Sequence, residues 1–299
     1  MKDLVLYCKS YRRDFLRLRR LLASIQQYNV DQIPFYISTP QDQFDELRNV
    51  LGLDGYQWVS DESIVAANHR APIGVEKTRS GSLAQQAIKS EFWRLGISEN
   101  YVCLDSDCIF IRNFDLTDFL SPDGNPYTVI YQNKEFFQLA INRKHKRVVE
   151  NLCLEGETVK ELFGRKGPNY YCPCPPFIWS AKVWRSLDEK FLLPQGLTFW
   201  DISNAEHPET LLYLEALLNY RAIPLCPIEQ LFRIYYYDWQ YYLLRRLGES
   251  EDKLKANYLG VIYQSNWDSE MDFGAPTKSL ASLALRRIKR FGRYLQSYL

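Results

Sequence analysis

The sequence lacks long apolar runs and has almost no excess charge of either sign. It contains no run of about 18 apolar residues, the minimum for a membrane-spanning helix, and Met1-Lys2-Asp3 precedes a short apolar stretch without a signal-peptide core. The formal net charge of +1 gives no overall attraction to nucleic acid. We therefore expect a cytoplasmic protein that neither crosses the membrane nor binds nucleic acid.

Cysteine and histidine patterns typical of metal sites are also scarce. The chain has three histidines, at positions 69, 145 and 207, and an odd number of cysteines, seven. Several cysteines lie in apolar stretches, which favours a reducing compartment where the thiol acts as a small hydrophobic group. Cys172 and Cys174 are one residue apart and lack a second pair, so we interpret them as part of a structural turn.

Strand and helix patterns alternate regularly in the first hundred residues. Hydrophobic residues form 46% of the 299-residue chain, enough for one large core. Apolar runs predict strands at 4–8, 34–38, 56–60 and 101–104, and helical spacing predicts helices at 15–25, 45–51 and 82–95. This alternation predicts an α/β protein with a mainly parallel sheet covered by helices on both faces.

Two aspartates directly follow the fourth predicted strand, in the stretch YVCLDSDCIF (101–110). In open α/β sheets, ligands bind beyond the carboxyl ends of the strands, where Asp105 and Asp107 fall. The two acids repel each other unless a cation joins them, and hard divalent cations prefer carboxylate oxygens. A solvated acidic turn is the alternative, but the position behind a buried strand favours a metal site.

The segment Leu104-Asp105-Ser106-Asp107 resembles the Asp-x-Asp motif of nucleotide-sugar-dependent glycosyltransferases of the GT-A fold. The stretch GSLAQQAIK (81–89) resembles the Gln-Gln-x-x-Lys helix that precedes this motif in several bacterial members. The stretches PFIWS (176–180) and QSNW (264–267) are similar to segments of bacterial transferases of this type.

The resemblance covers about residues 1–270 and implies a GT-A-like, Rossmann-type sandwich. Residues 1–115 would form the half that binds the nucleotide-sugar donor, and residues 116–270 the acceptor half. Residues 271–299 would form an appended C-terminal helical segment.

The same resemblance implies metal-dependent transfer of a sugar from a nucleoside diphosphate sugar to a glycan or lipid-linked acceptor, in bacterial surface polysaccharide assembly. Mn²⁺ or Mg²⁺ would neutralise the charge that develops on the diphosphate leaving group. The family pattern makes Asp107 the direct metal ligand and places Asp105 on the ribose or on a metal-bound water. The family's third ligand is often a C-terminal histidine, which this chain lacks, so Asn266 and Asp268 are the candidates.

The nucleotide is expected beyond the first and third predicted strands. Ser10 and Tyr11 follow the first strand, where Tyr11 is placed to stack on a base, and Asp61 stands where such enzymes often hold the base. Gln86 and Lys89 belong to the motif helix, and Lys89 ranks first among the cations expected on the diphosphate. For residues 10–13, a solvated basic helix start is an equally supported alternative.

An inverting reaction needs a base to activate the acceptor, and the segment NAEHPET (204–210) offers two carboxylates. Pro208 and Glu209 precede an amphipathic helix at 211–220, so Glu209 also suits the positive end of a helix. Glu209 is the first candidate base and Glu206 the second, with helix capping as the alternative. A retaining enzyme needs no such base, which leaves the stereochemistry open.

The end of the chain differs in character, because residues 281–299 contain five basic residues and no acidic one. Apolar residues recur among them at roughly helical spacing, which predicts a basic amphipathic helix. Such a helix suits the anionic inner face of a membrane, where each basic side chain adds about 1 kcal/mol. Docking on the protein's own domain is the alternative.

Aromatic residues are dense between 232 and 242, and Trp179, Trp200 and Trp267 are further candidates for stacking on a sugar. Because aromatic residues bury large areas, a core or interface role is the alternative for all of them.

Two other functions are alternatives to glycosyl transfer. A phosphohydrolase of the haloacid dehalogenase type also places Asp-x-Asp after a strand and uses the first aspartate as nucleophile. It usually has Thr or Val next and lies near the amino terminus, whereas Cys108 follows here after a hundred residues. The other alternative is a sugar-nucleotide-binding protein without turnover, which would keep the fold and the site.

Overall fold

The computed structural model describes residues 2–78, 81–130, 134–142, 146–170, 175–204 and 206–265, with the short stretches 284–285, 288–289 and 291–292. The strands are β1 (Lys2–Lys9), β2 (Phe35–Thr39), β3 (Gln57–Ser60), β4 (Ser98–Leu104), β5 (Cys108–Phe110), β6 (Thr128–Val129), β7 (Phe177–Ser180), β8 (Pro227–Ile228), β9 (Phe232–Tyr235) and β10 (Gly260–Tyr263). The α-helices are α1 (Phe15–Tyr28), α2 (Phe44–Leu51), α3 (Asp61–Ala66), α4 (Val75–Thr78), α5 (Gly81–Glu91), α6 (Lys134–Asn142), α7 (Lys146–Leu162), α8 (Ala181–Leu187), α9 (Phe199–Ile202), α10 (Glu209–Tyr220), α11 (Asp238–Arg246) and α12 (Glu251–Asn257).

A five-stranded sheet in the order β3-β2-β1-β4-β7 forms the centre of the protein. Strands β1 to β4 run parallel to their neighbours, and β7 pairs antiparallel with β4. The middle strand β1 is buried on both faces, as its continuous apolar run LVLYC predicts. The expected α/β fold with a mainly parallel central sheet is therefore confirmed.

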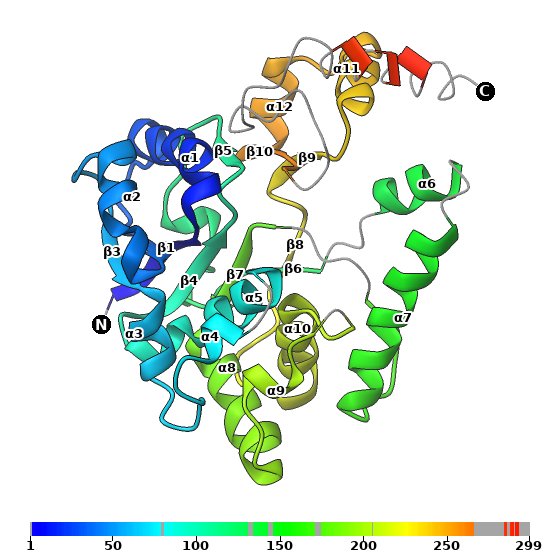
Figure 1. Ribbon diagram of the computed structural model, residues 1–299. Helices are drawn as coiled ribbons and strands as arrows, with labels where there is room; N and C mark the ends of the chain where they lie inside the picture. The colour runs from blue at the N-terminus through cyan, green and yellow to red at the C-terminus, as the bar shows by residue number, and fades with distance from the viewer. Residues whose placement is uncertain are drawn as a thin grey trace.

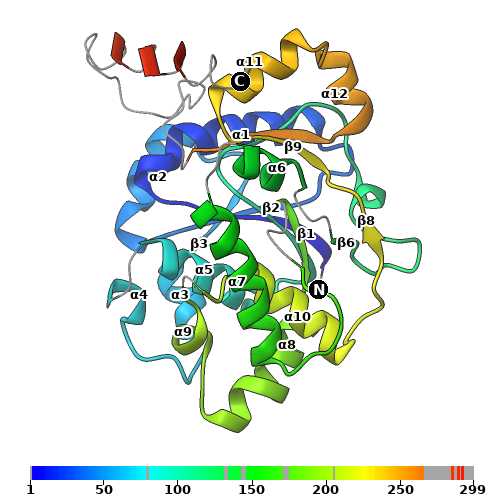
Figure 2. The ribbon, with the colours of Figure 1, turned by 90° about the vertical axis from the view of Figure 1, so that its right-hand side faces the viewer.

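The two faces of this sheet are covered by different helices. Successive side chains of β1 point to opposite faces, so Leu4 and Leu6 join one apolar core with α1, whereas Val5 and Tyr7 join another with α5, α8 and α10. Figures 1 and 2 show α1 and α2 on one side of the sheet and α5, α8 and α10 on the other. The helical spacing of the apolar residues thus predicted α1, α2 and α5 correctly, with shifts of a few residues at their ends.

A second sheet, in the order β5-β10-β9, extends the molecule on the α1 side. Strand β5 follows the two aspartates and pairs antiparallel with β10, with Cys108 opposite Ile262. Strand β10 pairs in parallel with β9, and β6 pairs in parallel with β8 in a small two-stranded sheet. Because β5 and β10 come from the predicted donor and acceptor halves, the two halves share one sheet.

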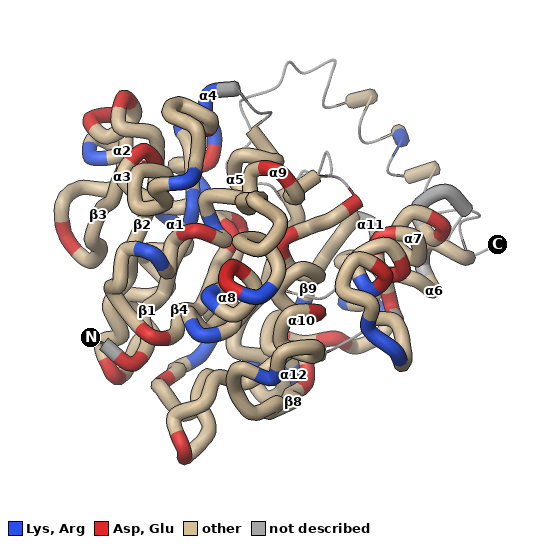
Figure 3. Tube along the Cα trace, turned by 90° about the horizontal axis from the view of Figure 1, so that it is seen from below, with Lys and Arg blue, Asp and Glu red and all other residues tan. Residues whose placement is uncertain are grey.

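Basic and acidic residues are intermixed over the face of the protein drawn in Figure 3, in line with the small net charge. The predicted C-terminal helix at 271–299 lies largely outside the described residues, apart from the three short helical stretches between 284 and 292.

No helix in the described part of the chain is both long enough and apolar enough to cross a lipid bilayer.

The tryptophans proposed for sugar stacking belong instead to the core, where the structure describes them. Trp179 and Trp200 are 2% and 1% exposed, and the ring of Trp179 packs edge-on against Trp184 with centroids 5.1 Å apart. Their large apolar area is used for packing, so the core role applies to Trp179 and Trp200, and neither is available to stack on an acceptor sugar. Trp267 lies outside the described residues.

Candidate active site

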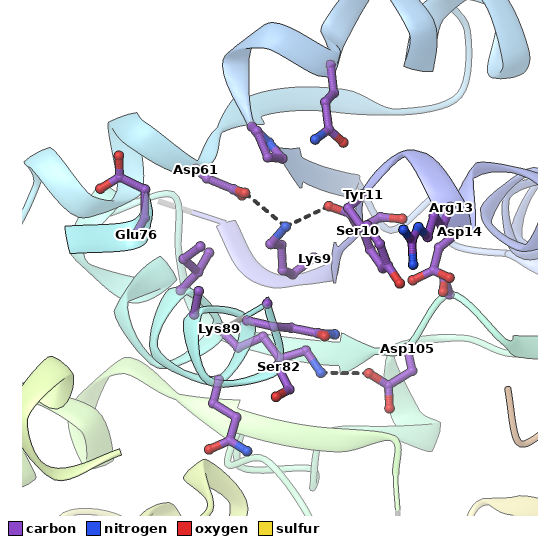
Figure 4. A pocket seen from close by; sticks show the side chains of 18 of the residues that line it. Lys9, Ser10, Tyr11, Arg13, Asp14, Asp61, Glu76, Ser82, Lys89 and Asp105 are labelled. Atoms are coloured by element: carbon purple, nitrogen blue, oxygen red, sulfur yellow. Dashed lines mark hydrogen bonds and ion pairs between the residues drawn. The ribbon is translucent and has the colours of Figure 1, made fainter. Parts of the chain in front are cut away.

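A cavity of about 1620 Å³ opens at the carboxyl ends of β1, β2, β3 and β4. Ser10, Pro40, Asp61 and Asp105 each follow one of these strands directly or by one residue, and all four line the cavity. Parallel strands end at the same edge of a sheet, so residues far apart in the sequence meet there (Figure 4). The edge predicted from the sequence is therefore where the cavity lies.

The two aspartates of the Asp-x-Asp motif lie in a tight turn between β4 and β5. The amide of Cys108 donates to the carbonyl oxygen of Asp105 at 3.0 Å, which closes this turn. Because β5 pairs with β10, the chain after β10 passes beside Asp107, and the Ser265 amide donates to Asp107 Oδ2 at 2.9 Å.

The second carboxylate oxygen of Asp107, Oδ1, is buried and has no hydrogen-bond partner among the described residues. Burial, together with the nearby charge of Asp105, raises the pKa of Asp107 to about 6, although the hydrogen bonds from Ser265 oppose the rise. A buried, unpartnered carboxylate oxygen next to a second carboxylate is chemically suited to a hard divalent cation.

No group of three or more histidine, cysteine or acidic side chains in the described residues gathers closely enough to enclose a metal ion. The candidates for a third ligand, Asn266 and Asp268, lie outside the described residues. Among the described residues, Asp105 and Asp107 are thus the carboxylates that could contribute to a metal site, and they would form only part of a coordination shell.

Lys89 reaches the acid pair from helix α5. Its Nζ donates to Asp105 Oδ1 at 2.6 Å, and its side chain is 6% exposed. Ser82, Gln86 and Lys89 lie at spacings of four and three residues, on the helix face that lines the cavity. The core residues Ala84 and Ile88 also reach the cavity lining, whereas Ala87 belongs to the core alone.

The ionisation of Lys89 is set by its acidic surroundings. Burial lowers the pKa of Lys89, but Asp105, Cys103 and Glu209 raise it more, so that the net pKa lies well above the usual value. The ammonium group therefore stays charged at any physiological pH.

Lys9 and Asp61 form a second buried pair, at the β1–β3 side of the cavity. Lys9 Nζ lies 2.9 Å from Asp61 Oδ2 and donates to the carbonyl oxygen of Ser10 at 2.7 Å (Figure 4). The Ser60 hydroxyl accepts from the Ser63 amide at 3.0 Å and caps α3, which fixes Asp61 as the first residue of that helix. Burial raises the pKa of Asp61, and the charge of Lys9 opposes this rise.

The described residues that surround Ser10 leave its buried hydroxyl oxygen without a hydrogen-bond partner. Tyr11, the next residue, is 40% exposed and lines the cavity. A buried hydroxyl and an accessible ring thus stand side by side at the exit of β1, where the sequence predicted nucleotide contacts.

The structure brings only one of the two candidate bases into the cavity. Glu209 is the first residue of α10, is 7% exposed and lines the cavity, and burial raises the pKa of its carboxyl group while Lys89 opposes the rise. Glu206 is exposed and is not part of the cavity lining, and its backbone amide donates to Asn204 Oδ1 at 2.8 Å. The two residues between them, His207 and Pro208, separate a loop carboxylate from a helix-start carboxylate.

Gln86, the remaining predicted residue, also lines the cavity. Its Oε1 accepts a hydrogen bond from the Ser203 hydroxyl at 3.1 Å. The other end of the same amide, the NH₂ group, is a hydrogen-bond donor. Apart from Glu206, every predicted site residue that the structure describes thus lies in one cavity.

Sequence reasoning missed part of this cavity. The Lys9–Asp61 pair joins two residues that are distant in the sequence, and no local pattern shows it. Residues 40–43, Glu76 and Ser82 also line the cavity. The signal for 40–43 was available, because Pro40 follows a predicted strand at the same sheet edge.

A family model matches residues 3–220, which is more than two thirds of the chain, and it is described as a family of unknown function, DUF6492. The chain belongs to this family. In this DUF6492 member, the matched range runs from β1 to the end of α10 and contains both motif aspartates and both candidate bases, whereas Ser265 and the candidate ligands Asn266 and Asp268 lie beyond it.

Two solved structures of the galactosyltransferase LgtC are similar to this DUF6492 protein over most of the chain. One, a complex with donor and acceptor sugar analogs, is 12% identical, with 86% of each chain covered and a TM-score of 0.42. The other, an active-site mutant, is 14% identical, covers 96% of this chain and 95% of that chain, and has a TM-score of 0.46. No curated protein matches the sequence.

Proposed function

We propose that the protein is a metal-dependent glycosyltransferase that moves a sugar from a nucleoside diphosphate sugar to a glycan or lipid-linked acceptor. The observation that carries the proposal is the unpartnered, buried Oδ1 of Asp107, which lies beside Asp105 in a cavity large enough for a nucleotide sugar. The resemblance of the Asp-x-Asp segment to the GT-A motif supports the same function.

Asp107 would ligate Mn²⁺ or Mg²⁺ directly, with Asp105 beside it on a metal-bound water or on the ribose. Such a cation, when bound, neutralises the charge that builds up on a departing diphosphate. Since the described residues provide only part of a coordination shell, water and the phosphates of the donor would complete it.

Lys89 would supply positive charge to the diphosphate from the α5 side. Its ion pair with Asp105 holds the ammonium group in place before the donor arrives, so no reorganisation is needed when charge develops. On the β1 side, Ser10, Tyr11 and Asp61 would hold the ribose and the base, with Tyr11 stacking on the base.

Glu209 would accept the proton of the acceptor hydroxyl in an inverting reaction. Its carboxylate lines the same cavity as the acid pair, and burial raises its pKa toward the range useful for a base at neutral pH. Its place at the start of α10 also stabilises the helix, so the two roles are compatible.

The C-terminal stretch would hold the protein at the anionic inner face of the membrane, close to a lipid-linked acceptor. The large apolar side chains described there are exposed: Leu285 at 58%, Ile288 at 71% and Phe291 at 62%. Sedimentation with vesicles containing anionic lipid tests this part, since a chain ending at residue 280 should stay in the supernatant while the full chain pellets. Equal sedimentation of both chains would contradict it.

The decisive test of function combines binding with turnover. Thermal shifts with UDP, GDP, CDP and CMP, each with Mn²⁺, Mg²⁺ or EDTA, should show stabilisation by one diphosphate that requires metal. Nucleotide sugars of the same base should then release the diphosphate in the presence of metal.

Three results would contradict the proposal. Binding without any turnover over a broad panel of donors and acceptors would indicate a sugar-nucleotide-binding protein. Hydrolysis of phosphate monoesters that depends on Asp105 would indicate a phosphohydrolase. Binding of CMP that does not depend on metal would show that the acid pair does not act through a divalent cation on a diphosphate.

A further inference from the structure

The start of α1 forms a basic rim at the mouth of the cavity. The segment YRRDFLRLRR (11–20) contains five arginines. Arg13 lies in a short 3-10 helix (Arg12–Asp14) that leads directly into α1, and it lines the cavity together with Leu16 and Arg17 of α1. Leu16 is 45% exposed, so cationic and apolar side chains lie together on this rim.

Arg13 differs from the neighbouring arginines in having no acidic partner. Arg12 lies 3.9 Å from Asp42 and 3.6 Å from Glu46, and Arg17 pairs with Asp14. Arg13, by contrast, is exposed and makes no hydrogen bond or ion pair with any residue that the structure describes.

Figure 4 shows Arg13 beside Tyr11 and Asp14, on the same side of the cavity as Asp105. The two deep cations of the cavity are already engaged, because Lys9 is held by Asp61 and Lys89 by Asp105. Arg13 is therefore available to an anion that enters at the mouth.

The charge of the donor does not need Arg13. In the proposed function, Lys89, which is 6% exposed and keeps its ion pair with Asp105, and the metal ion would together face a donor diphosphate bound at the acid pair. An exposed arginine without a partner on the rim instead suits a group outside the donor, on the molecule that must approach from solvent.

The same face of α1 continues toward a cluster of tyrosines. Arg20, three residues after Arg17, interacts electrostatically with Tyr263. Burial raises the pKa of Tyr263, and the positive charge of Arg20 opposes the rise. The ring of Tyr263 stacks on Tyr235 with centroids 5.6 Å apart, and from Tyr263 the chain continues to Ser265 in the cavity lining. Tyr235 is buried, whereas Tyr263 is only partly buried, and a partly exposed tyrosine near an arginine suits a sugar ring that carries negative charge.

We propose that the acceptor of this enzyme carries an anionic group, a phosphate or a carboxylate, which binds Arg13 at the cavity mouth. The inference rests on the proposed transferase function and names the class of its second substrate. A phosphate-linked lipid and an acidic glycan share this chemistry, and the experiment separates them.

The experiment is a calorimetric titration of the full chain, saturated with Mn²⁺ and its preferred nucleoside diphosphate so that the donor site is closed to the probes. The probes are geranyl diphosphate, trigalacturonate and the neutral trisaccharide maltotriose. The variants are Arg13→Gln, Arg13→Lys and the matched control Arg19→Gln, because Arg19 is an exposed α1 residue outside the cavity lining.

At least one anionic probe should bind about tenfold more tightly than maltotriose, and Arg13→Gln should remove that difference while nucleotide affinity is unchanged. Arg13→Lys should retain part of the difference, and Arg19→Gln all of it. A preference for geranyl diphosphate assigns a phosphate-linked lipid, and a preference for trigalacturonate assigns an acidic glycan.

Equal binding of all three probes, or an anion preference that survives Arg13→Gln, would overturn the inference and leave the transferase function standing. The two failures can be told apart, because loss of the metal-dependent nucleotide binding in the first step would overturn the proposed function itself.

Discussion

Two groups of acids in this protein have their hydrogen bonds satisfied to different degrees. In the remote pairs, Arg94–Glu91, Arg165–Glu215 and Arg233–Glu135, each acid meets a guanidinium group, and none of these residues lines the cavity. Glu215 uses both carboxylate oxygens on Arg165, and Glu91 also accepts from Asn68 at 2.7 Å. These acids have their hydrogen bonds completed by the protein.

The cavity acids Asp105 and Asp107 are left incomplete by comparison. Asp105 has one contact with a lysine, and Asp107 Oδ1 is buried without a partner among the described residues. Buried polar groups in native proteins are usually hydrogen-bonded, so an incomplete carboxylate at a strand end marks a place where a ligand supplies the missing contact. The difference separates acids that stabilise the fold from acids kept for function.

Replacing Asp107 should have the largest effect on activity and little on folding. Asp107→Asn removes the proposed metal ligand but can still accept from the Ser265 amide. We expect metal-dependent turnover to fall about a thousandfold, because the cation contributes several kcal/mol to the transition state. Release of the diphosphate from the donor measures this.

The melting temperature of Asp107→Asn in EDTA should equal or exceed that of the wild type, since a buried charge is removed. Asp54→Asn, at an exposed turn, is the matched control and should leave activity unchanged. Full activity of Asp107→Asn would show that Asp107 is not needed for turnover and would contradict the functional role of the acid pair.

Breaking a remote pair should give the reverse pattern. Arg165→Met leaves the carboxylate of Glu215, 1% exposed, without its partner, so the free energy of unfolding should fall by about 3 kcal/mol. Urea denaturation measures this, and nucleotide binding well below the transition should not change. The double variant Arg165→Met/Glu215→Leu should recover most of the loss, and a lost nucleotide affinity in the single variant would contradict the division into two groups.

The candidate bases sharpen the comparison within the cavity region. For an inverting reaction, Glu209→Gln should lower kcat about a hundredfold with little change in the KM for the donor. Glu206→Gln, three residues away and outside the cavity lining, is its matched control and should behave as the wild type. Equal kcat in both variants would show that Glu209 is a helix-start charge only.

The raised pKa of Asp107 predicts a pH dependence of metal binding. Burial and the charge of Asp105 raise this pKa from 3.8 to about 6, so protons compete with Mn²⁺ below that pH. Affinity for Mn²⁺ should fall about tenfold for each pH unit below 6 and should level off above it.

The same shift sets the sign of the effect on stability without metal. An acid whose pKa is raised on folding contributes most below its unfolded value, and this contribution is lost as the pH rises from about 4 to 6. Calorimetry in EDTA between pH 4 and 8 should therefore show that Asp107→Asn reduces this loss, and an unchanged pH profile in the variant would argue against the shift.

The sequence predicted the parts of the fold that repeat a simple period. Apolar runs located β1 to β4, because a strand buried in the sheet is apolar along most of its length. Helical spacing located α1, α2 and α5, because each of these helices buries one apolar face. The start of β4 was placed at 101 instead of 98, since its first residues Ser98, Glu99 and Asn100 are polar and give no strand signal.

Contacts between distant segments were beyond such reasoning. The pairing of β5 with β10, which brings Ser265 to Asp107, follows from the register of two short strands separated by about half of the chain. That Ser10, Tyr11, Asp61, Gln86, Lys89, Asp105, Asp107 and Glu209 line one cavity could nevertheless be anticipated, because each of them follows a parallel strand or lies on a helix at the same sheet edge. Glu206 differs from Glu209 only by a turn, and where a helix begins is decided within one or two residues.

The most direct test of the account is the position of manganese in crystals soaked with Mn²⁺ and the nucleoside diphosphate that binds best. We expect an anomalous peak within about 2.5 Å of a carboxylate oxygen of Asp107, beside the diphosphate. Ordered nucleotide in the cavity with no manganese at Asp107 would contradict the account.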